Sequence, residues 1–493
     1  MPNGPESAFP TSPGSIPTKT PEERALVEAF FRRGQGHVFR FFAELTDAER
    51  RQLLEQARGV DLDLLDRLVA EVLAPGAHAS PARTPRLEPV EAIDASPREA
   101  AAARAEGDSL LRAGRVAAFV VAGGQGTRLG VDSPKGLFPV GPLSGKSLFQ
   151  IHVEKTLHWS RRFSRPVPFV VMTSAATHAA TVEFFERNRR FGLASGDLLF
   201  AEQASIPAVD KGGKLLLETP GRIFTNPNGH GGAFQAIERS GALRALEGRG
   251  IEHLFYFQVD NPLLPVLDPV FLGHHVAHRS EMSSKVVEKT APDEKVGVVA
   301  RIDGRVGVVE YSDLPEELAR KRDASGRLEF RHGSIAVHAF SLAFVRRMAD
   351  ARAALPYHRA VKKIPHVGDD GRPVAPSEPN GIKFETFVFD ALPHARNPVF
   401  VRVDRDDEFY PLKNATGENS PDAVRRAIVE QHASWLRAAG VDVPRDASGG
   451  SAAVEIGPLY AVDRVSLEAR LAASPVEYRP NLRLDEPGPR SAG

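Results

Sequence analysis

The stretch Val116–Gly136, VAAFVVAGGQGTRLGVDSPKG, constrains the fold more than any other part of the chain. It begins with a run of apolar residues, which predicts a buried strand. Three glycines follow, the first at Gly123, so the turn after the strand can bring bare backbone N–H groups against a ligand. Arg128 and Lys135 add two cations to the same loop. Together these features favour a bound anion, above all a polyphosphate. A glycine turn with two solvated cations is the alternative that the loop alone leaves open.

Two familiar glycine-loop motifs are excluded by one residue each. In the dinucleotide-binding pattern G-x-G-x-x-G, counted from Gly124, the last position is occupied by Leu129. The P-loop pattern ends correctly in Gly145-Lys146-Ser147, but its first glycine would fall at Val140. The loop therefore belongs to neither class.

The composition excludes several classes of partner and chemistry. Lys+Arg and Asp+Glu both number 63, so the net charge is zero, and we expect neither nucleic acid nor a membrane surface as the main partner. The chain has no cysteine, which excludes disulfides, thiolate nucleophiles and cysteine metal sites. No apolar run approaches the roughly 18 residues that span a bilayer. The proline-rich start lacks the apolar core of a signal peptide, so we expect a cytoplasmic protein.

The sequence predicts four parts along the chain. Residues 1–20 are rich in proline and predict a disordered tail. Residues 21–112 predict a helical domain, in which Thr46 and Glu49 form a capping box at the start of a helix. This domain ends in a proline-rich linker at 74–97 and a helix into the glycine loop. We expect the central domain at 113–405 and a C-terminal domain at 406–493.

The central part predicts an α/β layer. Strands expected at 116–121, 168–172 and 254–259 alternate with helical patterns, which is typical of a largely parallel sheet. Ligands of such sheets lie at the carboxyl ends of the strands. Asp260 directly follows the third strand, so we expect it on the same rim as the glycine loop. A carboxylate there can hold Mg²⁺, whereas a turn-forming aspartate is the alternative reading.

The sequence predicts further elements whose link to a reaction is weaker. Asp303-Gly304 predicts a hairpin turn between two short β segments. The run 381–395 predicts a helix. A second glycine patch, residues 226–232, precedes a helix and either packs against a base or sugar or simply leads into that helix. The single lysines Lys383 and Lys413 are, taken alone, typical of solvated side chains.

Seven long motifs occur in order along the chain: AGGQGTRLGVDSPKG (122–136), VDNPLL (259–264), KVVEKTAPDEKVGVV (285–299), VVEYSDL (308–314), KKIPHV (362–367), PNGIKFETFVFD (379–390) and DEFYPLKN (407–414). With these motifs the chain resembles one family, the UDP-N-acetylhexosamine pyrophosphorylases, within the wider group of UTP:sugar-1-phosphate uridylyltransferases (UDPGP type 1). The resemblance extends from about residue 34 to about residue 459.

The resemblance implies a fold and a reaction. The fold is α/β: a central Rossmann-like nucleotidyltransferase domain with a mixed sheet, a helical N-terminal domain and a small C-terminal α+β domain. The reaction joins UTP and a sugar 1-phosphate into a UDP-sugar and pyrophosphate with the help of Mg²⁺. The sugar phosphate implied first is N-acetylglucosamine 1-phosphate.

The resemblance also implies roles for individual residues. The nucleotide contacts are Val121, Ala122, Gly123, Gly124, Gln203 and Gly229. The phosphate-binding cations are Arg128, Lys135, Lys383 and Lys413. The metal ligand is Asp260, and the sugar contacts are His230, Gly297, Glu310 and Ser334.

Two positions depart from the family pattern. The family has asparagine where this chain has His230, after the uracil-contacting glycine, and again where it has Ser334. Both asparagines are expected near the sugar or its acetamide, so glucose 1-phosphate or a broad range of sugars stays open as the alternative substrate.

Two other classes of protein fit the sequence less well. A non-catalytic UDP-sugar-binding regulator would lack phosphate-binding cations or the metal carboxylate, and this chain keeps all of them. A nicotinamide-dependent oxidoreductase would need the intact dinucleotide fingerprint, which is absent.

Overall fold

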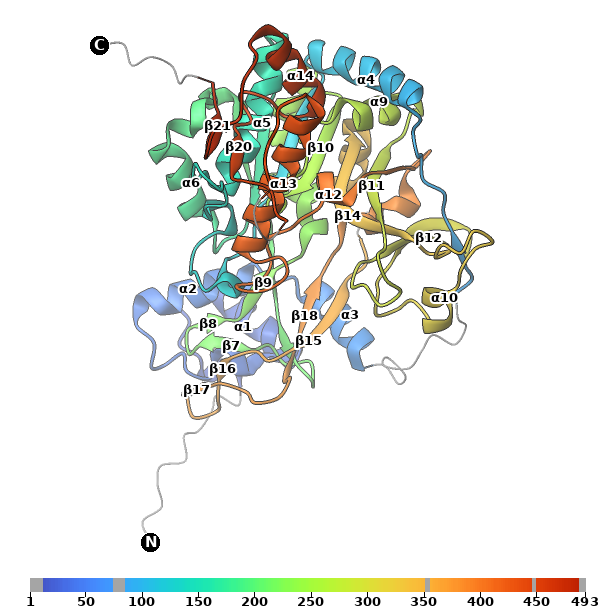
Figure 1. Cartoon of the computed structure of the whole chain (residues 1–493). Coiled ribbons are helices and arrows are strands. Elements are labelled where there is room, and N and C mark those ends of the chain that lie inside the picture. The colour runs from blue at the N-terminus through green and yellow to red at the C-terminus, as the bar shows by residue number, and fades with distance from the viewer. Residues whose placement is uncertain (1–11, 74–84, 351–354, 446–448, 487–493) are drawn as a thin grey trace, which may run out of the picture. The chain divides into compact units, whose positions relative to one another are not determined.

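The computed structural model describes residues 12–73, 85–350, 355–445 and 449–486 (Figure 1). Contacts divide the chain into two compact units. The first unit comprises residues 1–84, 204–232 and 355–387, and the second comprises 85–203, 233–354 and 388–493. The first unit thus joins the N-terminal helices to two segments from within the span 113–405. The boundaries expected from the sequence stay a prediction.

A mixed sheet forms the centre of the second unit. Strands β2 (Val116–Val121), β3 (Phe169–Thr173), β4 (Leu198–Glu202) and β10 (His253–Gln258) run parallel in the order β10-β2-β3-β4. On the other side of β10, β14 (His332–Ser341) runs antiparallel. The mixed sheet is therefore confirmed, while the largely parallel arrangement holds only for this half.

The antiparallel half of the sheet contains one confirmed prediction and one correction. Strands β12 (Val298–Ile302) and β13 (Arg305–Val309) form the expected hairpin, and its two turn residues have the positive φ angles of 46° and 85° that a tight hairpin turn requires. Strand β1 (Leu87–Pro89) pairs with β12, so this part of the predicted linker is wrong: it is an edge strand. Residues 74–84 of that linker lie outside the described residues. The remaining strands of the sheet are β11 (Met282–Glu288) and β19 (Val399–Arg402).

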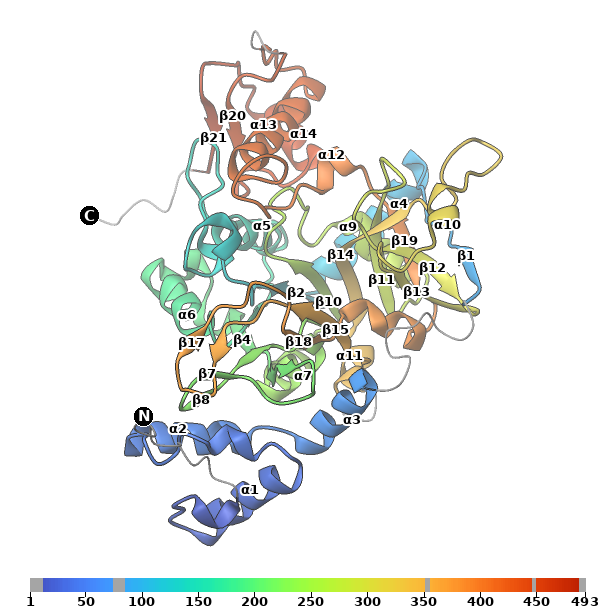
Figure 2. The same ribbon diagram turned by 90° about the horizontal axis from the view of Figure 1, so that it is seen from below.

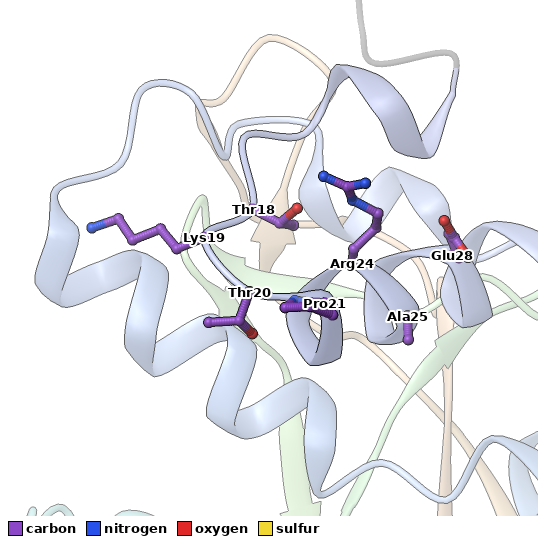
Figure 3. Close-up of a pocket in the computed structure, with 7 residues that line it drawn as sticks. All are labelled: Thr18, Lys19, Thr20, Pro21, Arg24, Ala25 and Glu28. Atoms are coloured by element: carbon purple, nitrogen blue, oxygen red, sulfur yellow. The ribbon is translucent and has the colours of Figure 1, made fainter.

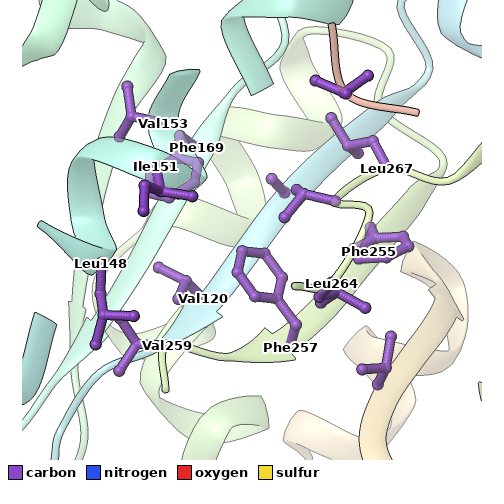
Figure 4. Close-up of a cluster of buried hydrophobic side chains, with 14 of the residues drawn as sticks. Val120, Leu148, Ile151, Val153, Phe169, Phe255, Phe257, Val259, Leu264 and Leu267 are labelled. Carbon is purple, nitrogen blue, oxygen red and sulfur yellow. The ribbon is translucent and has the colours of Figure 1, made fainter. Parts of the chain in front are cut away.

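Helices cover both faces of the sheet. Val116, Ala118 and Val120 of β2 pack into a large apolar cluster that includes Phe257 and residues of α4 (Pro97–Arg112), α5 (Leu148–Phe163) and α9 (Pro269–Ala277), part of which Figure 4 shows. Aromatic residues pack on the opposite face of the sheet, where Phe119 of β2 contacts Tyr256. The rings that continue this opposite layer are Phe340, Phe234 of α7 (Ala233–Arg239) and Phe344 of α11 (Leu342–Ala349).

The C-terminal residues of the second unit have a core of their own. Figure 2 shows α13 (Pro421–Ala438), β20 (Val454–Ile456), α14 (Arg464–Ala473) and β21 (Leu482–Leu484) together. Their apolar side chains form a separate cluster. Shorter helices of the second unit are α6 (His178–Arg187), α8 (Ala242–Gly248), α10 (Glu316–Arg320) and α12 (Arg405–Glu408).

The first unit combines three helices with small sheets. Its helices are α1 (Pro21–Arg32), α2 (Asp47–Arg58) and α3 (Leu62–Leu73), and the expected capping box of Thr46 and Glu49 starts α2. Its strands are β5 (Ser205–Pro207), β6 (Val209–Asp210), β7 (Leu217–Thr219), β8 (Arg222–Ile223), β9 (Thr225–Pro227), β15 (His358–Lys362), β16 (His366–Val367), β17 (Pro373–Val374) and β18 (Gly381–Glu385).

A buried glutamine helps to explain why this unit draws on distant segments. The Gln35 amide donates to the carbonyl oxygen of Gly213 at 2.9 Å and accepts from the N–H of Leu215 at 3.0 Å. Of the tail predicted to be disordered, residues 12–20 are described, and Ile16 is buried among the helices. Residues 1–11 of that tail lie outside the described residues.

The helix predicted over 381–395 is wrong. Its first residues form β18, which pairs with β15 and alternates the buried Ile382 and Phe384 with the more exposed Lys383 and Glu385. A 3-10 helix follows at Val388–His394 and contains Pro393. The apolar spacing of this run fits both the period of a helix and the period of a strand. Pairing with a distant strand decides between the two structures.

Helices α4 and α9 lie side by side and approach through glycines (Figure 1). A Cβ atom added at Gly273 would lie 1.7 Å from the backbone oxygen of Ala103, and one added at Gly107 would lie 1.9 Å from that of Pro269. Only residues without a side chain allow this separation of the helices.

We expect Gly273→Ala to lower the free energy of unfolding by about 1–3 kcal/mol, because the methyl group overlaps backbone that has no room to move. Gly248→Ala in α8 is the matched control, since an added Cβ there meets nothing within 4 Å. Denaturant unfolding of the two variants measures the difference. Equal stability of both variants would contradict the close helix approach.

Candidate functional site

The glycine loop folds back on itself directly after β2. The N–H of Gly126 donates to the oxygen of Ser133 at 2.8 Å, and the N–H of Lys135 donates to the oxygen of Gly124 at 3.1 Å. Gly124 is exposed, and a Cβ atom added to it would meet nothing within 4 Å. Arg128 is exposed on the same loop. The loop thus presents backbone and a cation to solvent, as an anion site requires.

Two of the backbone groups implied as nucleotide contacts are used inside the sheet. The oxygen of Val121 accepts from the N–H of Val259 at 3.1 Å, and the N–H of Ala122 donates to the oxygen of Met172 at 2.8 Å. The roles of Val121 and Ala122 toward a nucleotide stay predictions.

Lys135 and Asp260 meet at the rim of the sheet, as the sequence predicted. Parallel pairing aligns Val121 of β2 with Gln258 of β10, so the residues that follow both strands leave the sheet side by side. The Nζ of Lys135 lies 3.2 Å from Oδ2 of Asp260, and both side chains are about four-fifths buried, at 20% and 18% exposure. The predicted phosphate cation and the predicted metal carboxylate therefore form an ion pair.

The segment that ends in Lys413 docks against the same pair. The Nζ of Lys135 also donates to the oxygen of Leu412 at 3.3 Å, and the N–H of Leu412 donates to the oxygen of Asp260 at 2.8 Å. Lys413 itself is exposed next to this contact. Lys135, Asp260 and Lys413 are thus brought together from three distant parts of the sequence.

Sequence reasoning missed the residue that fastens this segment. The side-chain amide of Asn261, which is buried, donates to the oxygen of Glu408 at 2.6 Å and accepts from the N–H of Tyr410 at 3.1 Å. The signal was present, because an asparagine directly after a strand-end carboxylate is well placed to bond a neighbouring chain. Only the fold shows which chain it bonds.

The predicted uracil reader Gln203 lies against the glycine loop. It directly follows β4, and a Cβ atom added to Gly123 would lie 2.3 Å from its amide nitrogen. Its Oε1 is buried without a hydrogen-bond partner among the described residues. A buried amide oxygen in that state is costly unless a ligand or water satisfies it, so this side chain fits a hydrogen-bonding ligand.

Three of the predicted sugar contacts also come together in the second unit. The N–H of Ser334 donates to the oxygen of Gly297 at 2.9 Å. A Cβ atom added to Gly297 would lie 3.3 Å from Oε1 of Glu310. These residues belong to or flank β12, β13 and β14, so the antiparallel half of the sheet builds this group.

The remaining predicted residues belong to the first unit. Gly229 has a φ of 88°, and a Cβ atom there would lie 2.3 Å from the oxygen of Thr386, so only glycine fits. The His230 ring stacks on Phe387 at 5.3 Å between centroids. Burial lowers the pKa of His230 to about 4, with a further contribution from the neighbouring His358, so this imidazole is neutral at pH 7. Lys383, on β18, is half-buried over the ring of Phe224, and burial lowers its pKa.

Comparison with known proteins identifies the family to which the chain is similar. The family model described as UTP--glucose-1-phosphate uridylyltransferase matches residues 67–439. The chain is 39% identical over 425 residues to the UDP-N-acetylhexosamine pyrophosphorylase-like protein 1 of Xenopus tropicalis, with 83% of each chain covered. It is 34% identical over 480 residues to the UDP-N-acetylglucosamine diphosphorylase 2 of Arabidopsis thaliana, with 93% of each covered. It also resembles the crystal structure of the UDP-N-acetylglucosamine pyrophosphorylase from Trypanosoma brucei in complex with inhibitor. That similarity has a TM-score of 0.78 at 29% identity and covers 95% of this chain and 99% of the other.

The chain belongs to the UTP--glucose-1-phosphate uridylyltransferase family. This membership confirms the resemblance indicated by the motifs and makes the chain a nucleotidyltransferase. Within the described residues, no helix is both long enough and apolar enough to cross a membrane.

The donor set of this uridylyltransferase-family chain limits the kind of metal site that it can build. Among the described residues, no group of three or more His, Cys, Asp or Glu side chains could hold an ion. Mg²⁺ needs only one or two carboxylates when phosphate oxygens and waters supply its other ligands. The single carboxylate of Asp260, at the rim beside the cations, fits that kind of site.

Two surface hollows of the first unit contain none of the predicted site residues. One, of about 240 Å³, lies at the start of α1 and is lined by Thr18, Lys19, Thr20, Pro21, Arg24, Ala25 and Glu28 (Figure 3). The other, of about 520 Å³, is lined by residues that include His37, Arg40, Lys214 and His366. Neither hollow therefore adds a residue to the predicted site.

Buried neutral imidazoles give this family member a characteristic pH dependence of stability. Burial lowers the pKa of six histidines to about 3 or about 4: His152, His230, His253, His275, His332 and His432. Their unfolded pKa is about 6.5, so the unfolded state binds more protons as the pH falls below that value. Glu408, whose pKa is raised to about 7 by burial, acts in the opposite direction, but it is a single carboxyl group.

We expect the free energy of unfolding to decrease steadily as the pH falls from 6.5 to 5. Most carboxylates titrate below that window, so the histidines cause the loss. Denaturant unfolding at pH 7.5, 6.0 and 5.0 measures it. A constant or rising stability over this window would show that these imidazoles are not buried and neutral.

Proposed function

We propose that this chain transfers the uridylyl group of UTP to a sugar 1-phosphate and releases pyrophosphate, with N-acetylglucosamine 1-phosphate as the preferred sugar. The Lys135–Asp260 pair beside the open glycine loop is the observation that carries the proposal. The relatives named as N-acetylglucosamine and N-acetylhexosamine pyrophosphorylases support the choice of sugar.

The reaction suits a site made of amides and cations. An oxygen of the sugar phosphate attacks the α-phosphorus of UTP in line, the bond to the bridging oxygen breaks, and pyrophosphate leaves. The attacking oxygen is already anionic near neutral pH, because the second pKa of a phosphate monoester is about 6. A general base is therefore unnecessary. The protein has to bring two polyanions together and neutralise charge on the leaving group.

Each of the three predicted phosphate-binding cations of the second unit then has a role in the reaction. Arg128, exposed on the glycine loop, is placed to bind the terminal phosphates. Lys135 exchanges Asp260 for a phosphate oxygen when the nucleotide binds, because the triphosphate is the stronger anionic partner. Lys413 is placed to neutralise the sugar phosphate. Mg²⁺ on Asp260 would add positive charge next to the reacting phosphates. The roles of Gly229 and Lys383, in the first unit, rest on the family pattern.

Pyrophosphate release from UTP and a panel of sugar 1-phosphates tests this proposal. We expect N-acetylglucosamine 1-phosphate to give the highest kcat/KM. Equal or higher kcat/KM with glucose 1-phosphate would replace the sugar assignment with the alternative that His230 and Ser334 leave open. Absence of pyrophosphate release with every sugar, from a protein that still binds UTP, would contradict catalysis and favour a binding protein.

We expect Arg128→Ala to lower kcat/KM by at least about a hundredfold, because it removes a charge aimed at the leaving pyrophosphate. Arg244→Ala on α8 is the matched control, since Arg244 is also an exposed arginine. Both variants should melt at the same temperature as the wild type. Wild-type turnover in Arg128→Ala would remove this residue from the mechanism.

We expect His230→Asn to raise the ratio of kcat/KM for N-acetylglucosamine 1-phosphate over glucose 1-phosphate by about tenfold, because one carboxamide group can both donate to and accept from an acetamide, whereas a neutral imidazole has its donor and its acceptor on two separate ring nitrogens. Ser334→Asn tests the second departure from the family in the same way. A ratio unchanged by His230→Asn would show that this residue does not select the sugar.

A further inference from the structure

The segment that carries Asp260 has an unusual need for hydrogen bonds. Residues 259–266 follow β10, are mostly buried and form neither helix nor strand. The segment contains Pro262 and Pro265, which cannot donate to a sheet. Its carbonyl oxygens have no helix or sheet partners, so they need donors from other segments, because an unpaired buried carbonyl is costly.

One face of α5 supplies several of those donors, while Gln431 of α13 donates to the oxygen of Leu263 at 3.3 Å. The Nε2 of His152 bonds the oxygen of Val259 at 3.0 Å. The Nζ of Lys155 donates to the oxygens of Pro262 at 2.5 Å and Leu264 at 2.7 Å. The Nε1 of Trp159 donates to the oxygen of Val266 at 3.0 Å. The helix spacing of three and then four residues places these donors in one stripe along the segment.

The middle donor is the least expected residue for this position. Lys155 is buried, and its helix neighbours Ile151 and Val153 belong to the apolar cluster in Figure 4. Burying an ammonium group costs free energy unless strong hydrogen bonds compensate. Here two main-chain oxygens accept from it, so the lysine is used to hold this backbone.

These contacts lie on both sides of the reactive carboxylate. Asp260 is one residue after Val259 and two before Pro262, so its main chain is fixed on either side. The N–H of Leu412 adds a third contact, to the oxygen of Asp260 itself. Loss of the Lys155 contacts would leave the Asp260 carboxylate and its 3.2 Å approach to Lys135 less well defined.

We propose that Lys155 is a positioning residue, which fixes the Asp260 carboxylate for the metal and the phosphates by holding the carbonyls of Pro262 and Leu264 from the buried face of α5. This role rests on the proposed function, because it takes Asp260 as the metal ligand. Lys155 touches no reacting atom. A displacement of about 1 Å in such a group costs about a hundredfold in rate.

Lys155→Met is the variant that tests the proposal, since methionine keeps much of the length and removes the donors. Trp159→Phe is the matched control, because it removes one donor from the same helix face but at Val266, six residues beyond Asp260. We expect Lys155→Met to lower kcat at least tenfold and to raise the Mg²⁺ concentration for half-maximal activity, while KM for UTP at saturating Mg²⁺ changes less than twofold. Trp159→Phe should lower the melting temperature and leave the Mg²⁺ response unchanged. The same Mg²⁺ response in both variants would overturn the proposal.

Amide hydrogen exchange supplies a readout that does not depend on activity. We expect faster exchange in the peptide 259–268 of Lys155→Met than in the wild type, with the peptide 282–288 of β11 unchanged. Unchanged exchange in 259–268 would overturn the proposal even if activity fell. If the wild type released no pyrophosphate, the proposed function would fail, and the exchange result would still decide whether Lys155 holds this segment.

A second variant covers the case in which Lys155→Met does not fold. Lys155→Gln keeps an amide donor for one of the two carbonyls, so we expect an intermediate loss of kcat and intermediate exchange. Wild-type kcat, Mg²⁺ response and exchange in Lys155→Gln would overturn the proposal.

Discussion

The ion pair between Lys135 and Asp260 is the interaction on which the functional reading of this structure depends. Its two residues are far apart in sequence and meet because β2 and β10 are parallel neighbours in one sheet. Parallel strands end at the same edge, which is where α/β proteins bind ligands. In the proposed reaction, a nucleotide phosphate takes Lys135 and the metal ion takes Asp260, so ligand binding amounts to an exchange of partners within one small site.

Buried polar groups below the rim keep that pair in place. Asn261 fastens the 408–410 segment, and the side chains of α5 bond the carbonyls beyond Asp260. Deeper still, the fully buried Lys285 pairs with Asp268 at 2.6 Å and Glu408 at 2.5 Å. Such buried pairs add little net stability, because desolvation offsets their attraction, but they restrict which arrangement the chain can adopt. The apolar cluster supplies the stability, and the polar groups determine where the Asp260 carboxylate lies.

Local signals made much of this arrangement predictable from the sequence. The apolar run before Gly123 predicted β2, the Thr46–Glu49 pattern predicted a helix start, and Asp303-Gly304 predicted a hairpin, because each signal acts within a few residues. The meeting of the glycine loop and Asp260 followed from one general rule about parallel sheets. Structure was not predictable where a distant partner decides it: β1 exists because β12 pairs with it, and 381–385 is a strand because β15 lies beside it. The bonds made by Lys155 likewise depend on a loop about a hundred residues away, so no local pattern reveals them.

The most direct measurement is a crystal structure of the protein with UTP and Mg²⁺. Our account predicts that the triphosphate lies on the glycine loop near Gly124, that Lys135 has turned from Asp260 to a phosphate oxygen, and that the metal contacts Asp260. A nucleotide bound elsewhere, with Lys135 still paired to Asp260, would contradict it.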